Sequence, residues 1–149
     1  MKNALTILLL SSTLLAAGAT FAQGTPPAKS AAPAAAGKSG EAVFKETCVV
    51  CHGTGLLKAP KFGDKKDWAE LIKEPQATLT ADGWVGVRDM PPKGGKPDLA
   101  LEEFSRAVAY MARAAGSTWK DPDAAMMKQI QAEEKKALDK KAKESKSKK

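Results

Sequence analysis

The chain has 149 residues, 43% of them hydrophobic and 28% charged, and its formal net charge is +7. The positive excess lies outside the middle of the chain: residues 40–119 hold eleven Lys and Arg against eleven Asp and Glu, whereas residues 120–149 hold ten Lys against six acidic residues. A nucleic-acid-binding fold carries its basic patch on the folded surface. The neutral central segment therefore argues against a nucleic-acid partner.

Residues 1–22 have the features of a secretion signal, with Lys2, an apolar run over residues 4–17 and small side chains before Gln23. In a bacterium this signal predicts the periplasm. An uncleaved anchor is the less favoured alternative, because the run is shorter than the ~20 apolar residues of a spanning helix; after cleavage we expect no transmembrane segment. Residues 23–39 are mainly Ala, Pro, Gly, Ser, Thr and Lys and predict a disordered linker.

A first helix is predicted over residues 40–51, because Val43, Phe44 and Cys48 recur at helical spacing. The apolar side of this helix leads directly to the two cysteines of the chain. Since both belong to the motif described next, no structural disulfide is expected.

The sequence Cys48-Val49-Val50-Cys51-His52 is the attachment signature of c-type haem. Two thiols three positions apart lie on one face of a helical turn, so both can form thioethers along one edge of a porphyrin. The next residue, His52, can then bind the iron from one side. A redox dithiol is less favoured because no strand pattern is found. A zinc site is less favoured because the chain has no other Cys or His.

A second helix is predicted over residues 64–74, with Asp64 as N-cap and Pro75 as its end. Its expected buried stripe is Trp68, Leu71 and Ile72. A short third helix is expected over residues 78–83, capped by its first residue, with Trp84 folding inward.

Residues 88–97 are predicted to form a loop, in which Pro91 and Pro92 keep Met90 out of helical geometry. A rigid loop of this kind can hold a thioether in place, so Met90 is the candidate for the second axial ligand of iron. A lysine ligand or an open iron position is the alternative. The other methionines of the mature chain are expected in the core or the polar tail: Met111, Met126 and Met127.

The last helix of the domain is predicted to be capped by Asp98 and to end at Gly116. Its apolar stripe is Leu101, Phe104, Val108, Met111 and Ala115. The sequence thus predicts a small all-α domain over residues 40–116, with about four helices. A chain this short builds little core, so a buried haem would supply missing apolar surface, and we expect the haem-free protein to be poorly folded.

The segment 40–116 resembles a class I cytochrome c domain, and most of all bacterial cytochrome c5. The resemblance rests on Gly40, Phe44, the pentapeptide 48–52, residues 59–64 with Trp68, Met90-Pro91-Pro92-Lys93-Gly94-Gly95 and residues 107–111. It covers about half of the chain. Members of that family often carry an extra Cys pair, which this chain lacks.

The resemblance implies one covalently attached haem c, with thioethers at both cysteines, a proximal His and a distal Met. The residues assigned to the cofactor are Cys48, Cys51, His52, Met90, Pro60 and Trp68, and the iron ligands are His52 and Met90. By analogy, Trp68 is expected to donate its indole N–H to a haem propionate; for it and for Trp84, core packing is the alternative. The first and last helices are expected to cross, with Gly40 and Phe44 near Tyr110.

Residues 117–149 form a Lys-rich tail with few apolar positions. A helical stretch is predicted to begin at Asp121-Pro122 within this tail, and it is expected to be solvated and to fray. The alternative is docking onto an acidic redox partner or an anionic membrane surface.

Together these features predict a periplasmic monohaem electron carrier that cycles Fe(III)/Fe(II) with His/Met ligation. No paired acids or nucleophile–base arrangement is found, so we expect no enzyme. The alternatives are an electron-transfer subunit or module of a larger oxidoreductase and, less favoured, a haem sensor or peroxidase-like protein. The expected partners are redox proteins that donate and accept electrons.

Overall fold

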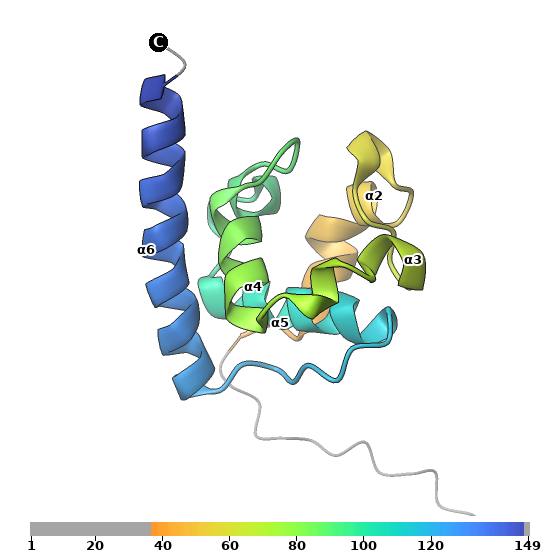
Figure 1. The fold of residues 1–149 in the computed structure, drawn as a ribbon. Helices are drawn as coiled ribbons and strands as arrows, with labels where there is room; N and C mark the ends of the chain where they lie inside the picture. The colour runs from red at the N-terminus through yellow and green to blue at the C-terminus, as the bar shows by residue number, and fades with distance from the viewer. Residues whose placement is uncertain (1–36, 148–149) are drawn as a thin grey trace, which may run out of the picture. The chain divides into compact units, whose positions relative to one another are not determined.

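The computed structural model describes residues 37–147, and all regular structure within that range is helical. This confirms the predicted all-α fold. Figure 1 shows the helices α4, α5 and α6 together with the shorter helices around them. The predicted signal segment, residues 1–22, lies outside the described residues, as does the predicted linker up to residue 36.

The first helical segment runs without a break through α1 (Gly40–Val43), a π-helical turn η1 (Phe44–Cys48) and α2 (Val49–His52). The hydroxyl of Ser39 caps it by accepting a hydrogen bond from the Ala42 N–H at 3.2 Å. The predicted first helix is thus confirmed, and it extends to His52. The wider π turn ends at the first cysteine, Cys48, and such turns are frequent at functional sites.

The predicted linker ends earlier than expected, because Lys38 is held by α5 (Leu101–Ala114). The Lys38 N–H donates to the Glu103 carboxylate at 2.8 Å, and the Arg106 side chain donates to the Lys38 carbonyl at 2.8 Å. Lys38 and Ser39 are therefore part of the folded domain, which corrects the expectation of a linker through residue 39.

The first segment crosses α5 at Gly40, as the family resemblance implied. A Cβ added at Gly40 would lie 2.2 Å from the Arg106 carbonyl oxygen and 3.0 Å from Tyr110 Cβ, so only glycine allows the two helices to approach this closely. The rings of Phe44 and Tyr110 are 5.8 Å apart between centroids. Phe62 stacks on both of these rings.

After the first segment, η2 (Leu56–Lys58) leads to α3 (Lys65–Trp68) and η3 (Leu71–Lys73). Asp64 caps α3, accepting hydrogen bonds from two backbone N–H groups, as predicted. The prediction of one helix over residues 64–74 is wrong in its length, because the α-helix ends at Trp68. Leu71 and Ile72 pack at the edge of the core and are only partly buried.

The next helix, α4 (Gln76–Val85), begins before residue 78 and continues past Gly83, which corrects the predicted helix over residues 78–83. Pro75 takes the N-cap position without a side-chain hydrogen bond. Trp84 is buried, as predicted. It packs edge-on against Phe104 of α5, with ring centroids 5.4 Å apart.

The short turn η4 (Pro92–Gly95) connects α4 to α5, which begins at Leu101 with Ala100 as N-cap. Asp98 is therefore not the cap, and that prediction is wrong. Leu99 donates its N–H to the Lys96 carbonyl in a turn and is buried, so the helix starts after it. The apolar stripe of α5 packs in the core as predicted, with Leu101 at its edge, and Gly116 follows the helix with φ +104.

The tail forms one long helix, α6 (Ala124–Ser147), which lies beside α4 in Figure 1. Its first turn is capped by Asp123, whose carboxylate accepts a hydrogen bond from the Met126 N–H at 2.8 Å. Ile130 is fully buried and Ala137 is buried with it. The prediction of a solvated, fraying helix is therefore wrong, because one side of α6 is covered by the rest of the domain.

None of the helices within residues 37–147 combines the length and the apolar character that crossing a membrane requires.

Candidate functional site

The two cysteines lie at the end of the first helical segment, where η1 passes into α2. Cys48 is buried and Cys51 is half-buried, and neither forms a disulfide. Burial, with a smaller contribution from the charge of Cys51, raises the pKa of the Cys48 thiol to about 11. A reactive dithiol needs a lowered thiol pKa. The redox-dithiol interpretation is thus disfavoured, whereas both thiols remain available for covalent attachment.

The imidazole of His52 is buried and is held by the loop that follows the motif. Its Nδ1–H donates to the Pro60 carbonyl over 2.9 Å. The backbone is tied as well, because the Phe62 N–H donates to the His52 carbonyl at 2.6 Å. A protonated Nδ1 leaves Nε2 as the nitrogen with a lone pair, which is the arrangement of a metal-binding histidine oriented by a backbone carbonyl.

Trp68 lies beside this histidine, with ring centroids 6.5 Å apart. Its indole N–H donates to the Lys61 carbonyl at 2.9 Å. The expected hydrogen bond from this indole to a propionate is therefore corrected, because the single indole donor is already used within the loop. Trp68 instead fixes residues 60–61, whose carbonyl at Pro60 orients His52.

Met90 follows α4 in a tight loop, half-buried against the core. Its N–H donates to the Val87 carbonyl at 2.9 Å, and Pro91 after it is extended, with φ −70 and ψ 155. A Cβ added at Gly83 would lie 3.9 Å from Met90 Cε, so the thioether end reaches back to α4. Met111 is buried in the core, as predicted.

The loop that carries Met90 also approaches the segment that carries the cysteines. A Cβ added at Gly94, in η4, would lie 3.6 Å from the methyl group of Thr47, the residue before Cys48. The structure thus brings together two groups of predicted residues. Pro60, Trp68 and His52 form one group, and the Met90 loop and the Cys48 segment approach each other through Gly94 and Thr47.

These residues fit a covalently attached haem. Two thiols, a buried imidazole with Nε2 as acceptor and a loop-held thioether are the donors that such a cofactor uses. The buried hydroxyl of Thr47 has no hydrogen-bond partner. Buried polar groups without a hydrogen-bond partner are uncommon in native proteins, and a bound cofactor with polar edges would supply the partner. Among residues 37–147, no three or more His, Cys, Asp and Glu are placed to hold a bare metal ion.

Sequence reasoning missed the contribution of the tail to this region. Glu134 and Lys141 of α6 make hydrogen bonds to Trp84 and to the carbonyl groups at the end of α4. A charged residue within a Lys-rich run carries no signal that distinguishes a contact from a solvated side chain, so only the fold reveals these two.

Comparisons with known proteins show which family this chain resembles. Residues 35–111 match the family model described as "Cytochrome C oxidase, cbb3-type, subunit III". Cytochrome c-555 of Chlorobaculum tepidum is 38% identical over 107 residues, which cover 69% of this chain and 88% of that protein. Cytochrome c-555 of Chlorobaculum thiosulfatiphilum is 43% identical over 77 residues, covering 49% of this chain and 90% of the relative.

Cytochrome c5 of Azotobacter vinelandii is 40% identical over 76 residues, which cover 50% of this chain and 92% of the relative. Among solved structures, the chain is similar to one in a crystal structure titled as an electron-transfer complex of nitrite reductase with cytochrome c. The identity is 41% and the TM-score 0.49, covering 51% of this chain and 93% of that one.

Proposed function

We propose that this chain, which belongs to the c-type cytochrome family, is a monohaem electron carrier with His52 and Met90 as axial ligands. It is a small class I member similar to cytochrome c5, and members of this family carry covalently attached haem c. The bound haem supplies a one-electron Fe(III)/Fe(II) couple. The observation that carries the proposal is the His52–Pro60 hydrogen bond, which presents Nε2 for coordination.

Each residue of the site has a defined task in this proposal. Cys48 and Cys51 anchor the cofactor through their sulfur atoms, and His52 is held in one tautomer and one orientation by the Pro60 carbonyl. Met90 would supply the second iron ligand from a loop whose backbone is fixed by Pro91 and by its own hydrogen bond to Val87. With His52 and Met90 both bound to it, a haem held here would have no open position for a substrate, so we propose no enzymatic reaction.

Replacing Met90 tests the axial assignment. A Met90→Ala variant is expected to lose the weak long-wavelength absorption band of thioether-ligated ferric haem. Its midpoint potential should fall, because a Met ligand raises it. Met111→Leu is the matched control, since Met111 is buried in the core. A long-wavelength band that persists in Met90→Ala would show that another group binds the iron.

We also propose that the protein works in the periplasm as a mature chain beginning at Gln23, based on the signal-like residues 1–22. Sequencing the N-terminus of the protein from a periplasmic fraction tests this. A chain that still begins at Met1 would contradict it.

A second candidate function is an electron-transfer subunit of a larger oxidoreductase. The description of the matching family model favours it, because that model is described as an oxidase subunit. Purification of the protein from membranes together with catalytic subunits would support this function, and a free monomer in the soluble fraction would exclude it.

A further inference from the structure

The helix α6 makes its contact with the domain along α4 and is anchored there by apolar side chains. Ile130 is fully buried, Ala137 is nearly so, and Met127 is partly covered. The segment that leads to α6 is also tied down, because the Gln76 side chain donates to the Lys120 carbonyl at 2.9 Å and Arg113 pairs with Asp121 at 2.8 Å. The tail is therefore held to the domain both in the segment before α6 and in the middle of the helix.

Two polar contacts fix α6 to the C-terminal end of α4 in particular. The Lys141 ammonium donates to the carbonyl oxygens of Val85 and Gly86 at 2.7 and 2.9 Å. These carbonyls lack intrahelical partners at a helix end, and a cation there also complements the helix dipole. The Trp84 indole N–H donates to the Glu134 carboxylate at 2.9 Å.

The residues that α6 holds are the ones from which the Met90 loop departs. Gly86 has φ +84, and a Cβ there would lie 2.9 Å from Pro92 Cδ and 3.0 Å from the Met90 carbonyl oxygen. The loop is thus folded tightly against Gly86. From the other side, the Lys93 ammonium lies 5.0 Å from the centre of the Trp84 ring. Displacement of Trp84 or Gly86 would consequently move the loop that carries Met90.

We propose that α6 is a built-in strap that positions the Met90 loop, with Lys141 and Glu134 as its positioning residues. The proposal rests on the proposed function only where it concerns ligation by Met90, since the contacts themselves belong to the protein. In the absence of these contacts, the carbonyls of Val85 and Gly86 lose their partner and the loop opens more often.

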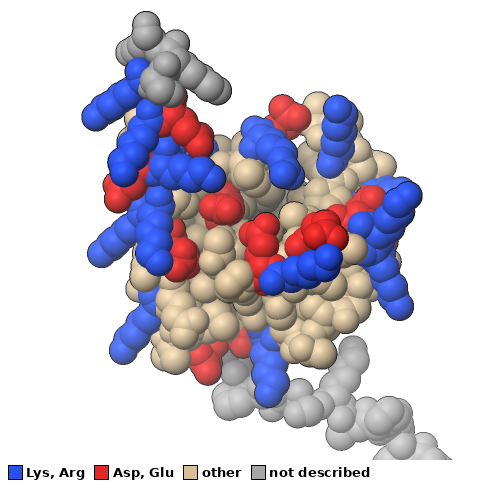
Figure 2. Space-filling model, viewed as in Figure 1, with Lys and Arg blue, Asp and Glu red and all other residues tan. Residues whose placement is uncertain are grey.

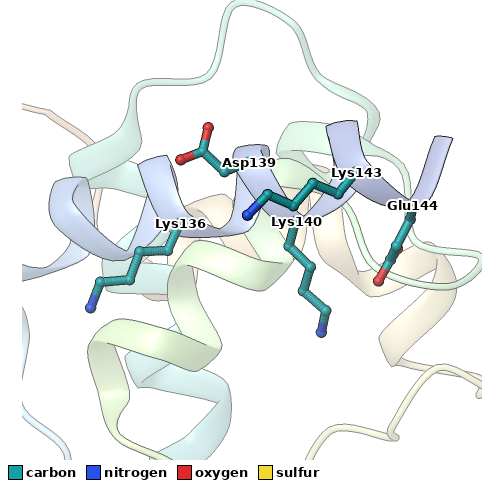
Figure 3. A pocket seen from close by; sticks show the side chains of 5 residues that line it. All are labelled: Lys136, Asp139, Lys140, Lys143 and Glu144. Carbon is teal, nitrogen blue, oxygen red and sulfur yellow. The ribbon is translucent and has the colours of Figure 1, made fainter. Parts of the chain in front are cut away.

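Lys141→Met tests the strap, and Lys140→Met is the matched control because the neighbouring Lys140 is solvent-exposed and lines a shallow pocket formed by residues of α6 alone (Figure 3). Both variants remove one charge and keep a long side chain of good helix propensity. In the full holoprotein, we expect the amides of Gly86 and Met90 to exchange with deuterium about tenfold faster in Lys141→Met than in Lys140→Met. Equal exchange in the two variants would overturn the proposal.

A second measurement tests whether opening of the loop exposes the proposed iron site. Added imidazole should displace the sixth ligand of the ferric protein about tenfold faster in Lys141→Met than in Lys140→Met, because opening of the loop precedes its binding. Glu134→Ala should also speed up the displacement by imidazole. Glu134→Gln should keep the slow rate of the unmodified protein, because its amide oxygen still accepts a hydrogen bond from Trp84. Unchanged rates in both Lys141→Met and Glu134→Ala would overturn the strap.

Failure of the strap and failure of the axial assignment give different results. If Met90→Ala retains the long-wavelength band, the axial assignment fails, whereas amide exchange in Lys141→Met still decides the strap. If Met90→Ala loses that band and Lys141→Met exchanges like Lys140→Met, the strap alone is overturned.

Discussion

At the scale of single residues, the backbone carbonyl of Pro60 and the indole of Trp68 act as a pair. Trp68 donates to the carbonyl of Lys61, which fixes the loop, and the neighbouring Pro60 carbonyl then accepts from His52 Nδ1. The sequence motif predicts that His52 is a ligand, but the orientation of its ring depends on a carbonyl eight residues later. Since every residue carries a backbone carbonyl, no side-chain pattern predicts this role.

Gly86 is the residue on which the geometry of the Met90 loop depends most. A Gly86→Ala substitution should lower the free energy of unfolding by about 1–3 kcal/mol, because φ +84 is strained for alanine and the added Cβ would meet Pro92 at 2.8–2.9 Å. It should also weaken the long-wavelength band, since Met90 would shift. Urea unfolding and the visible spectrum measure the two effects.

Gly63→Ala is the control for Gly86→Ala, because Gly63 has φ +76 and a Cβ there would meet nothing within 4 Å. It should cost only about 1 kcal/mol and leave the spectrum unchanged. Equal losses of stability in the two variants would contradict the steric role assigned to Gly86.

At the scale of elements, helices with local signals could be predicted and those defined by distant contacts could not. The stripe of α5 repeats every three or four residues, and its core position follows from that period alone. The start of α5 was misplaced because Asp98 is a good cap by type, whereas burial of Leu99 in a turn delays the helix to Leu101. The cysteine motif and the Met90 loop were located by spacing and by proline geometry.

The docking of α6 shows most clearly what a sequence pattern leaves out. Only a few apolar positions interrupt its lysines, and a single isoleucine is compatible with a solvated helix. Whether Ile130 is buried depends on the surface of α4, which lies far away in the chain. The same holds for Glu134, whose partner Trp84 is fifty residues distant.

The contribution of the α6 interface to stability can be measured through Ile130. Ile130→Ala should lower the free energy of unfolding by about 2 kcal/mol or more, because it removes a fully buried side chain. Leu138→Ala is the matched control on the same helix, since Leu138 is 50% exposed, and should change stability by no more than about 0.5 kcal/mol. If both changes cost the same small amount, α6 does not pack on the domain in solution.

At the scale of the whole molecule, the net positive charge of the described residues comes from α6, which holds seven Lys against four acidic residues. Figure 2 shows Lys side chains, in blue, projecting along this helix, with acidic residues among them. The outward lysines are Lys128, Lys135, Lys136, Lys140, Lys143 and Lys146. Because the helix is docked, these charges move with the domain, and we expect them to steer an acidic redox partner toward it.

Charge reversal at Lys135 and Lys143 tests this steering. The double Glu variant should slow electron transfer to an acidic partner protein at low salt and reduce the dependence of the rate on ionic strength, because steering is screened within a Debye length. Lys65 and Lys66 of α3, both exposed, provide the matched double variant elsewhere on the molecule. Equal losses of rate in the two double variants would show that α6 has no special part in the encounter.

The proposal as a whole depends on both axial positions of the iron being filled by the protein, by His52 on one side and Met90 on the other. The most direct measurement is the visible spectrum of the reduced holoprotein before and after exposure to carbon monoxide at neutral pH. We expect an unchanged spectrum, with a carbon monoxide adduct forming only in Met90→Ala. Rapid formation of that adduct in the unmodified protein would contradict a simple electron carrier and favour a haem sensor or enzyme.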